Sequence, residues 1–257
     1  MERNANTPHS FNQDEAVAYK KVLMQYFEQA GLNPYDREQW KQGIFQLFGI
    51  QFVNMPNLNA QNYVLSCNHI SDFDALYLGL MHPGIRIISK IGWASNRDLM
   101  DFLELHYNIV GIYRESEIEN LDTEAKKAAK EHNYKVTVDA VKYLKNTDEA
   151  RHLLIFPQGT ISDINRNSKE RINPGFAKIA HATKSRVINI FAEYPDLRGG
   201  TTRIIFGEPY AVTDRNFDCR QPWVDSVIAL QNSLDNLRQP IFSEKHLYNN
   251  NPNEAFF

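Results

Sequence analysis

Hydrophobic and polar positions follow two patterns along this chain, one typical of strands and the other of helices. Short apolar or β-branched runs predict strands at residues 51–54, 63–66, 85–89, 107–113, 152–156, 187–191 and 202–206. Stretches with apolar residues three or four positions apart predict helices at 12–31, 35–49, 122–145, 176–183 and 222–238. This alternation predicts an α/β fold with one mixed, largely parallel sheet that helices flank.

Two of the predicted helices precede the first strong strand, and an Asn-Pro break separates them. We therefore expect an N-terminal helical pair at residues 1–50, an α/β domain at 51–245 and an Asn-rich tail at 246–257. Two arrangements of the aromatic-rich pair are open. Either it packs on the core of the domain, or it rests on a bilayer as an amphipathic hairpin with Trp40 in the membrane interface.

Composition narrows the classes of protein to which the chain can belong. Of its 257 residues, 42% are hydrophobic and 23% are charged, which is sufficient for an ordinary buried core. The net charge of -3 argues against a dedicated nucleic-acid-binding protein. Two cysteines cannot form a disulfide framework, which fits a reducing cytoplasm. No apolar run approaches the ~18 residues that a membrane span needs, so we expect a protein that is soluble or held on a membrane surface.

The most informative stretch is 66–74, where a predicted strand passes into a helix that begins near Ser71 or Asp72. His69 lies in the turn between them, where α/β proteins place reactive groups, and the spacing lets Asp74 fold back onto its imidazole. Such an imidazole can take the proton of an alcohol that attacks a carbonyl, while the carboxylate orients the ring. The alternative is that Asp72 caps the helix and His69 is only a turn residue.

Two further strand ends carry groups suited to binding an anion. Arg114 closes the strand at 107–113, and its guanidinium could pair bidentately with a phosphate. The strand at 152–156 runs into the turn Pro157-Gln158-Gly159-Thr160, whose backbone N–H groups could cradle an anion at Gly159 and Thr160. The alternatives are a surface salt bridge for the arginine and an ordinary turn for the second stretch.

In order and spacing these stretches resemble the four sequence blocks of the glycerolipid acyltransferase family, best known for the lysophosphatidate acyltransferases. His69 and Asp74 match the first block, and Arg114 matches the end of the second. Residues 156–162 resemble the third block, and residues 187–190 the fourth. The resemblance covers roughly residues 60–210. It implies an acyltransferase that moves a fatty acyl group from acyl-CoA or an acyl-carrier protein to a lysophospholipid or glycerol-phosphate-type acceptor.

The resemblance also implies a role for each matching residue. His69 would be the general base and Asp74 its orienting partner. The other matches would bind the substrates: Asn68, Lys90, Arg114, Gln158, Gly159 and Thr160. No cofactor beyond the acyl donor is implied, and no second histidine lies at ligand spacing from the others, so we expect no metal. A lipid acceptor implies a cytoplasmic protein that binds peripherally to the inner face of the membrane.

Four positions depart from the residues usual in the family. Gln158 replaces a glutamate, Ile161 an arginine, Asn108 a glycine and Asn189 a proline. Because isoleucine cannot bind phosphate, the departure at 161 puts a phosphate-bearing acceptor in doubt. Because Gln158 and Ile161 both depart from the family, one alternative is a catalytically attenuated, lipid-binding member of the same fold. Another is a hydrolase that uses Cys67, which lies two residues before His69 and could face the same side of a strand.

Overall fold

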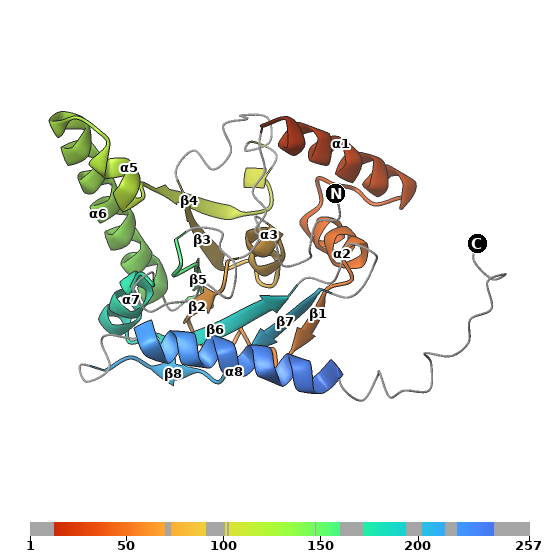
Figure 1. The fold of residues 1–257 in the computed structure, drawn as a ribbon. Helices are drawn as coiled ribbons and strands as arrows, with labels where there is room; N and C mark the ends of the chain where they lie inside the picture. The colour runs from red at the N-terminus through yellow and green to blue at the C-terminus, as the bar shows by residue number, and fades with distance from the viewer. Residues whose placement is uncertain are drawn as a thin grey trace, which may run out of the picture.

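A mixed, eight-stranded sheet forms the centre of the molecule in the computed structural model (Figure 1). The structure describes residues 13–69, 73–90, 101, 103–146, 148–159, 172–193, 202–213 and 220–238, so the predicted tail at 246–257 lies outside the described residues. The strands are β1 (Gln51–Val53), β2 (Tyr63–Cys67), β3 (Ile85–Lys90), β4 (Asn108–Ile112), β5 (His152–Ile155), β6 (Arg186–Glu193), β7 (Arg203–Phe206) and β8 (Tyr210–Ala211). Their order across the sheet is β1-β7-β6-β2-β5-β3-β4, and β8 pairs with β6.

Neighbouring strands β6, β2, β5, β3 and β4 run parallel to one another. By contrast, β7 and β8 run antiparallel to β6, and β1 is parallel to β7. The prediction of an α/β fold with one mixed, largely parallel sheet is therefore confirmed. Because the parallel strands share a direction, their carboxyl ends meet at one edge of the sheet, where α/β proteins bind their ligands.

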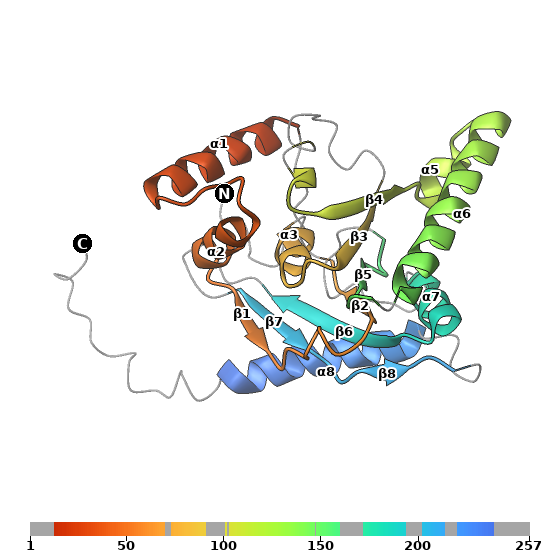
Figure 2. The ribbon, with the colours of Figure 1, turned by 180° about the vertical axis from the view of Figure 1, so that it is seen from behind.

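Helices cover both faces of the sheet (Figures 1 and 2). One face packs against α1 (Gln13–Gln29), α2 (Arg37–Leu47) and α3 (Phe73–Leu80), and the other against α6 (Thr123–Lys145), α7 (Gly175–Thr183) and α8 (Arg220–Arg238). Along β2, Val64 faces the second core and Leu65 the first. Burial on both faces explains why the central strands are continuous apolar runs. The apolar pattern does not predict the short helix α5 (Glu115–Glu119) or the two-residue strand β8.

The N-terminal helical pair packs on the domain core through aromatic side chains. The rings of Phe27 and Trp40 stack at a centroid separation of 4.8 Å, and Trp40 stacks on His106 at 5.0 Å. The Trp40 indole N–H donates to the Tyr107 hydroxyl at 3.0 Å, and Trp40 has no exposed surface. Gly43 lets the helices meet, since a Cβ there would clash with the Phe27 ring. Of the two open arrangements, the structure therefore contradicts the one with Trp40 in a membrane interface, because the core uses both its ring and its N–H. Among the described helices, none combines the length and apolar character required to span a bilayer.

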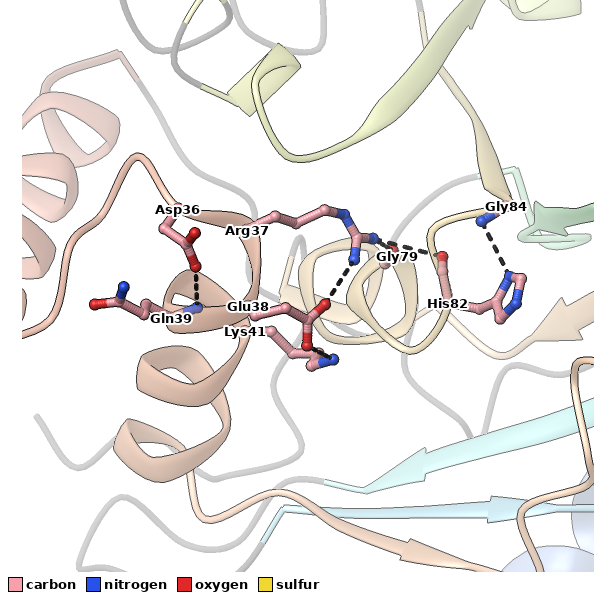
Figure 3. Close-up of polar contacts among 8 residues, drawn as sticks. All are labelled: Asp36, Arg37, Glu38, Gln39, Lys41, Gly79, His82 and Gly84. Atoms are coloured by element: carbon pink, nitrogen blue, oxygen red, sulfur yellow. Dashed lines mark hydrogen bonds and ion pairs between the residues drawn. The ribbon is translucent and has the colours of Figure 1, made fainter.

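Helix α2 also braces the end of α3 (Figure 3). Asp36 caps the start of α2. The next residue, Arg37, donates to the carbonyl oxygens of Gly79 at 3.3 Å and His82 at 3.5 Å, at the carboxyl end of α3. A cation there satisfies terminal carbonyl groups and complements the helix dipole. The brace bears on the candidate site because Asp74 lies in the first turn of the same helix.

Candidate active site

The turn after β2 brings an imidazole and a carboxylate together. Asp74 has no exposed surface, and its Oδ2 lies 3.0 Å from His69 Nδ1. A buried carboxylate that accepts the Nδ1–H fixes the tautomer and leaves the Nε2 lone pair to accept a proton. The His69 ring stacks on Phe156, just after β5, at a centroid separation of 4.2 Å. Its side chain is 13% exposed, so a substrate can reach it. The alternative cap, Asp72, lies outside the described residues.

Asn68 fixes the turn that carries His69. Its side chain is fully buried, its Oδ1 accepts the Ala192 N–H at 2.7 Å, and its Nδ2 donates to the Ala192 carbonyl at 3.1 Å. Both ends of the amide are therefore used by the backbone of β6. Two residues earlier, Ser66 Oγ accepts a hydrogen bond from Trp223 Nε1 of α8 at 2.6 Å. These buried contacts hold the end of β2, so Asn68 is a positioning residue and not the substrate-binding residue that we predicted.

Gln158 supports His69 from the neighbouring strand. β5 pairs in parallel with β2, and Gln158 follows β5 as His69 follows β2. The Gln158 Oε1 accepts the backbone N–H of His69 at 2.5 Å, and Gln158 is buried. A glutamate carboxylate would accept the same hydrogen bond, so the amide preserves this contact although it carries no charge.

The turn that contains Gly159 is closed by its own backbone. Gly159 has a φ of 66°, and its N–H donates to the Phe156 carbonyl at 2.9 Å, with Pro157 at the second position of the β-turn. The prediction that this N–H cradles an anion is wrong, because it is already used within the turn. Thr160 and Ile161 lie outside the described residues.

Two cations lie at the ends of the neighbouring strands β3 and β4. Lys90 ends β3 and pairs in register with Ile112, which ends β4 two residues before Arg114. The order β2-β5-β3-β4 places Lys90 two strands and Arg114 three strands from the strand of His69. At the ~4.8 Å spacing of strands, these separations are about 10 and 14 Å, which long side chains can partly span. His69, Gln158, Lys90 and Arg114 therefore belong to one edge of the sheet.

Glu117 in α5 is a member of this edge that our sequence analysis missed. Its Oε1 lies 2.7 Å from Lys90 Nζ, and its Oε2 accepts the Arg114 N–H at 3.0 Å. Partial burial tends to raise the pKa of Glu117, but its hydrogen bonds to Lys90 and Arg114 and their two charges lower this pKa overall. The carboxylate is therefore ionised at neutral pH. The sequence does hold a signal for it, since Arg114 and Glu117 have the spacing of an N-cap residue and the third helical residue.

Cys67 is unsuited to nucleophilic chemistry. The residue is fully buried in the core under α1–α3, and burial raises the pKa of its thiol well above the ordinary value, with the nearby Asp74 charge raising it further. The thiol stays protonated, 3.5 Å from Asn68 Oδ1. The alternative of a Cys67 hydrolase is therefore contradicted. Within the described ranges, no group of three or more His, Cys, Asp or Glu side chains is placed to hold a metal ion.

Known proteins provide three points of comparison. The family model described as Acyltransferase matches residues 49–192, a range that contains the whole edge from His69 to Gly159. The crystal structure of the 1-acyl-sn-glycerophosphate (LPA) acyltransferase, PlsC, from Thermotoga maritima is similar over 87% of this chain and 90% of that chain. Its TM-score is 0.44 and its sequence identity 17%. No curated protein sequence matches the chain significantly.

Proposed function

This chain belongs to the acyltransferase family, and we propose that it moves a fatty acyl group from acyl-CoA or an acyl-carrier protein to the hydroxyl of a lysophospholipid or glycerol-phosphate-type acceptor. The observation that carries the proposal is the His69–Asp74 pair, with Nδ1 held by a buried carboxylate 3.0 Å away. Such a pair can act as a general base that deprotonates a nucleophile, and the hydroxyl of the acceptor would be that nucleophile.

In the proposed reaction, His69 Nε2 takes the proton of the acceptor hydroxyl as the oxygen attacks the thioester carbonyl. A carbon–oxygen bond forms and the carbon–sulfur bond breaks. The imidazolium then returns its proton to the departing sulfur, so that a free thiol leaves. Asp74 stabilises the imidazolium between these two proton transfers. Lys90 and Arg114, at the neighbouring strand ends, attract the anionic headgroup of the acceptor.

The state of Gln158 bears on the catalytically attenuated alternative. Loss of the glutamate charge was one reason to consider a lipid-binding member without turnover. The Gln158 Oε1 nevertheless makes the contact to the His69 N–H that a carboxylate oxygen would make. This observation favours an active enzyme, and Ile161, the other departure that raised this alternative, lies outside the described residues.

The test is acyl transfer by purified His69→Ala protein, with His181→Ala on α7 as a matched control. Lysophospholipids with several headgroups and glycerol 3-phosphate serve as acceptors, and both thiol release and acylated product are measured for each donor. We expect kcat/KM to fall about 10²–10⁴-fold in His69→Ala and to stay near the wild-type value in the control. Wild-type rates in His69→Ala would show that another group is the base. Lysolipid binding by the wild type with no turnover of any donor would favour the attenuated alternative.

A lipid acceptor also implies contact with the inner face of a membrane, and we expect a cytoplasmic protein that associates peripherally. Deleting residues 1–50 would be a poor probe, because it exposes the core under Trp40 and Phe27. Val22 on α1 is 57% exposed, so Val22→Asp changes the surface of the pair without disturbing its packing. Co-sedimentation with liposomes should weaken in this variant. Equal sedimentation of both proteins would leave α1 a structural element only.

A further inference from the structure

Glu117 joins the ends of β3 and β4 through a single carboxylate. Its Oε1 forms an ion pair with Lys90 Nζ at 2.7 Å, and its Oε2 accepts the Arg114 N–H at 3.0 Å. The side chains of Lys90 and Glu117 are 38% and 30% exposed, so a ligand can reach the pair from solvent. An anionic headgroup drawn to these strand ends therefore meets a carboxylate as well as two cations.

The cluster carries less positive charge than its two cations suggest. Glu117 forms its close ion pair with Lys90, whereas the Arg114 guanidinium acts on that carboxylate only from a longer distance and has no close ion pair among the described residues. Among the described residues Lys90, Arg114 and Glu117, two positive charges and one negative charge leave the net charge of one cation. The resemblance leads one to expect a second arginine at position 161, but the sequence has isoleucine there. Position 161 therefore adds no positive charge.

Headgroup charge divides the possible acceptors into two classes. A phosphodiester carries one negative charge at neutral pH, whereas a phosphomonoester carries about -1.5 to -2 because its second pKa is near 6. The single charge of a phosphodiester is matched by Arg114 while the Lys90–Glu117 ion pair stays intact. A phosphomonoester must either bind beside the like charge of Glu117 or break the ion pair and leave a half-buried carboxylate without its cation.

We propose that Glu117 is a specificity-determining residue, which makes the acceptor site favour a phosphodiester lysolipid over a phosphomonoester. This inference rests on the proposed acyl transfer to a lipid acceptor. Glu117 acts by occupying Lys90, so that the site presents the charge of one cation instead of two.

The test compares Glu117→Gln with Glu119→Gln, which removes the same charge from an exposed position on the same helix. Glutamine still accepts the Arg114 N–H, so α5 keeps its first turn. The ratio of kcat/KM for lysophosphatidylglycerol to that for lysophosphatidate is measured with matched acyl chains. Wild type favours the phosphodiester, and Glu117→Gln shifts the ratio toward lysophosphatidate about tenfold, as expected for one charge a few ångströms away and partly screened. Lys90→Met, which leaves Glu117 without its cation, shifts the ratio in the opposite direction.

Binding of inorganic phosphate gives a readout that needs no acyl transfer. Calorimetry at pH 7.5 should show about tenfold tighter binding to Glu117→Gln and little change in Glu119→Gln. If this response appears in a protein that acylates nothing, the proposed function fails while the anion selectivity of Glu117 stands. An unchanged acceptor ratio together with unchanged phosphate affinity overturns the inference. An equal fall in kcat/KM for both acceptors overturns it too, because that result would reflect a structural role only.

Discussion

His152 offers a prediction whose size follows from the structure. It begins β5, the strand that leads to the Gln158 turn, and it has no exposed surface. Its ring stacks on Tyr63 at a centroid separation of 5.8 Å and meets the edge of His82 at 4.9 Å. Neither ring nitrogen of His152 makes a hydrogen bond of normal geometry in the described part of the chain, although the Leu58 backbone lies close enough to interact with the ring. Together, burial as the largest cause and the His82 charge lower the pKa of His152 from 6.5 to about 4, against an opposing interaction with the Leu58 backbone.

The sign of the pH dependence follows from this lowered pKa. Below pH 6.5 the unfolded chain binds a proton at His152, whereas the folded protein binds one only near pH 4. The free energy of unfolding therefore falls as the pH drops through this window. At about 1.4 kcal/mol per pKa unit, the loss from this group approaches about 3 kcal/mol, and it does not grow further below pH 4.

The assay is urea unfolding of wild type and His152→Leu between pH 4.5 and 8, with His181→Leu as a control. Leucine removes two unpaired nitrogens from a buried site, so the variant should match or exceed wild type at pH 7.5. At pH 4.5 it should exceed wild type by about 2–3 kcal/mol more than at pH 7.5. If the difference in unfolding free energy between the two proteins were the same at both pH values, the reasoning from burial would be refuted.

Three further substitutions test the His69–Asp74 pair and two contacts that support the fold away from the site. Asp74→Asn should lower kcat about 10²–10⁴-fold with little change in KM, because the imidazole loses the carboxylate that fixes its tautomer; steady-state kinetics showing wild-type kcat would contradict this. Arg37→Met should lower the free energy of unfolding by about 1–2 kcal/mol through loss of the α3 brace, whereas Lys41→Met, at a surface ion pair, should lower it by less than about 1 kcal/mol in the same urea titration. Trp40→Phe should cost about 2–3 kcal/mol in that titration, because it leaves the buried Tyr107 hydroxyl without the indole N–H; a cost equal to that of Lys41→Met would mean the hydrogen bond is unimportant.

Much of the fold follows from local sequence pattern. The runs at 63–66 and 152–156 predict strands because helices bury both faces of the sheet, so no polar residue interrupts them. The pattern does not predict α5, since Glu115–Glu119 is short and mostly acidic and has only one buried residue, Ile118. The direction of β7 and β1 is set by contacts far apart in sequence, and pattern alone does not determine it.

The N-terminal pair shows the limit of reasoning from amphipathicity. An aromatic stripe that includes Trp40 satisfies the requirements of a bilayer interface and of a protein core equally well. The arrangement is decided by partners that are distant in sequence, the Tyr107 hydroxyl and the His106 ring. Only the three-dimensional structure brings these groups together, so the sequence left both alternatives open.

The candidate site was predictable where it is local. His69 and Asp74 are five residues apart across a turn, and their meeting needs no distant partner. The prediction that the Gly159 N–H binds an anion was wrong, although the sequence held the correct signal. Proline at the second position and glycine at the fourth favour a β-turn that uses the glycine N–H. Glu117 was missed because its link to Lys90 depends on β3 and β4 being neighbours.

The His69–Asp74 pair and the Lys90–Glu117 pair differ in burial. This difference separates the catalytic step from the recognition of the acceptor headgroup. Asp74 is wholly buried and Asn68 uses its whole amide on β6, so the base is held in one geometry. Lys90 and Glu117 are partly in solvent, where charge interactions are weaker and easier to alter. Asp74→Asn should therefore lower kcat for every acceptor alike, whereas Glu117→Gln should change KM for the charged headgroup and leave kcat for the preferred acceptor. If both substitutions changed the same kinetic parameter for all acceptors, the edge would act as one unit and this separation would have to be abandoned.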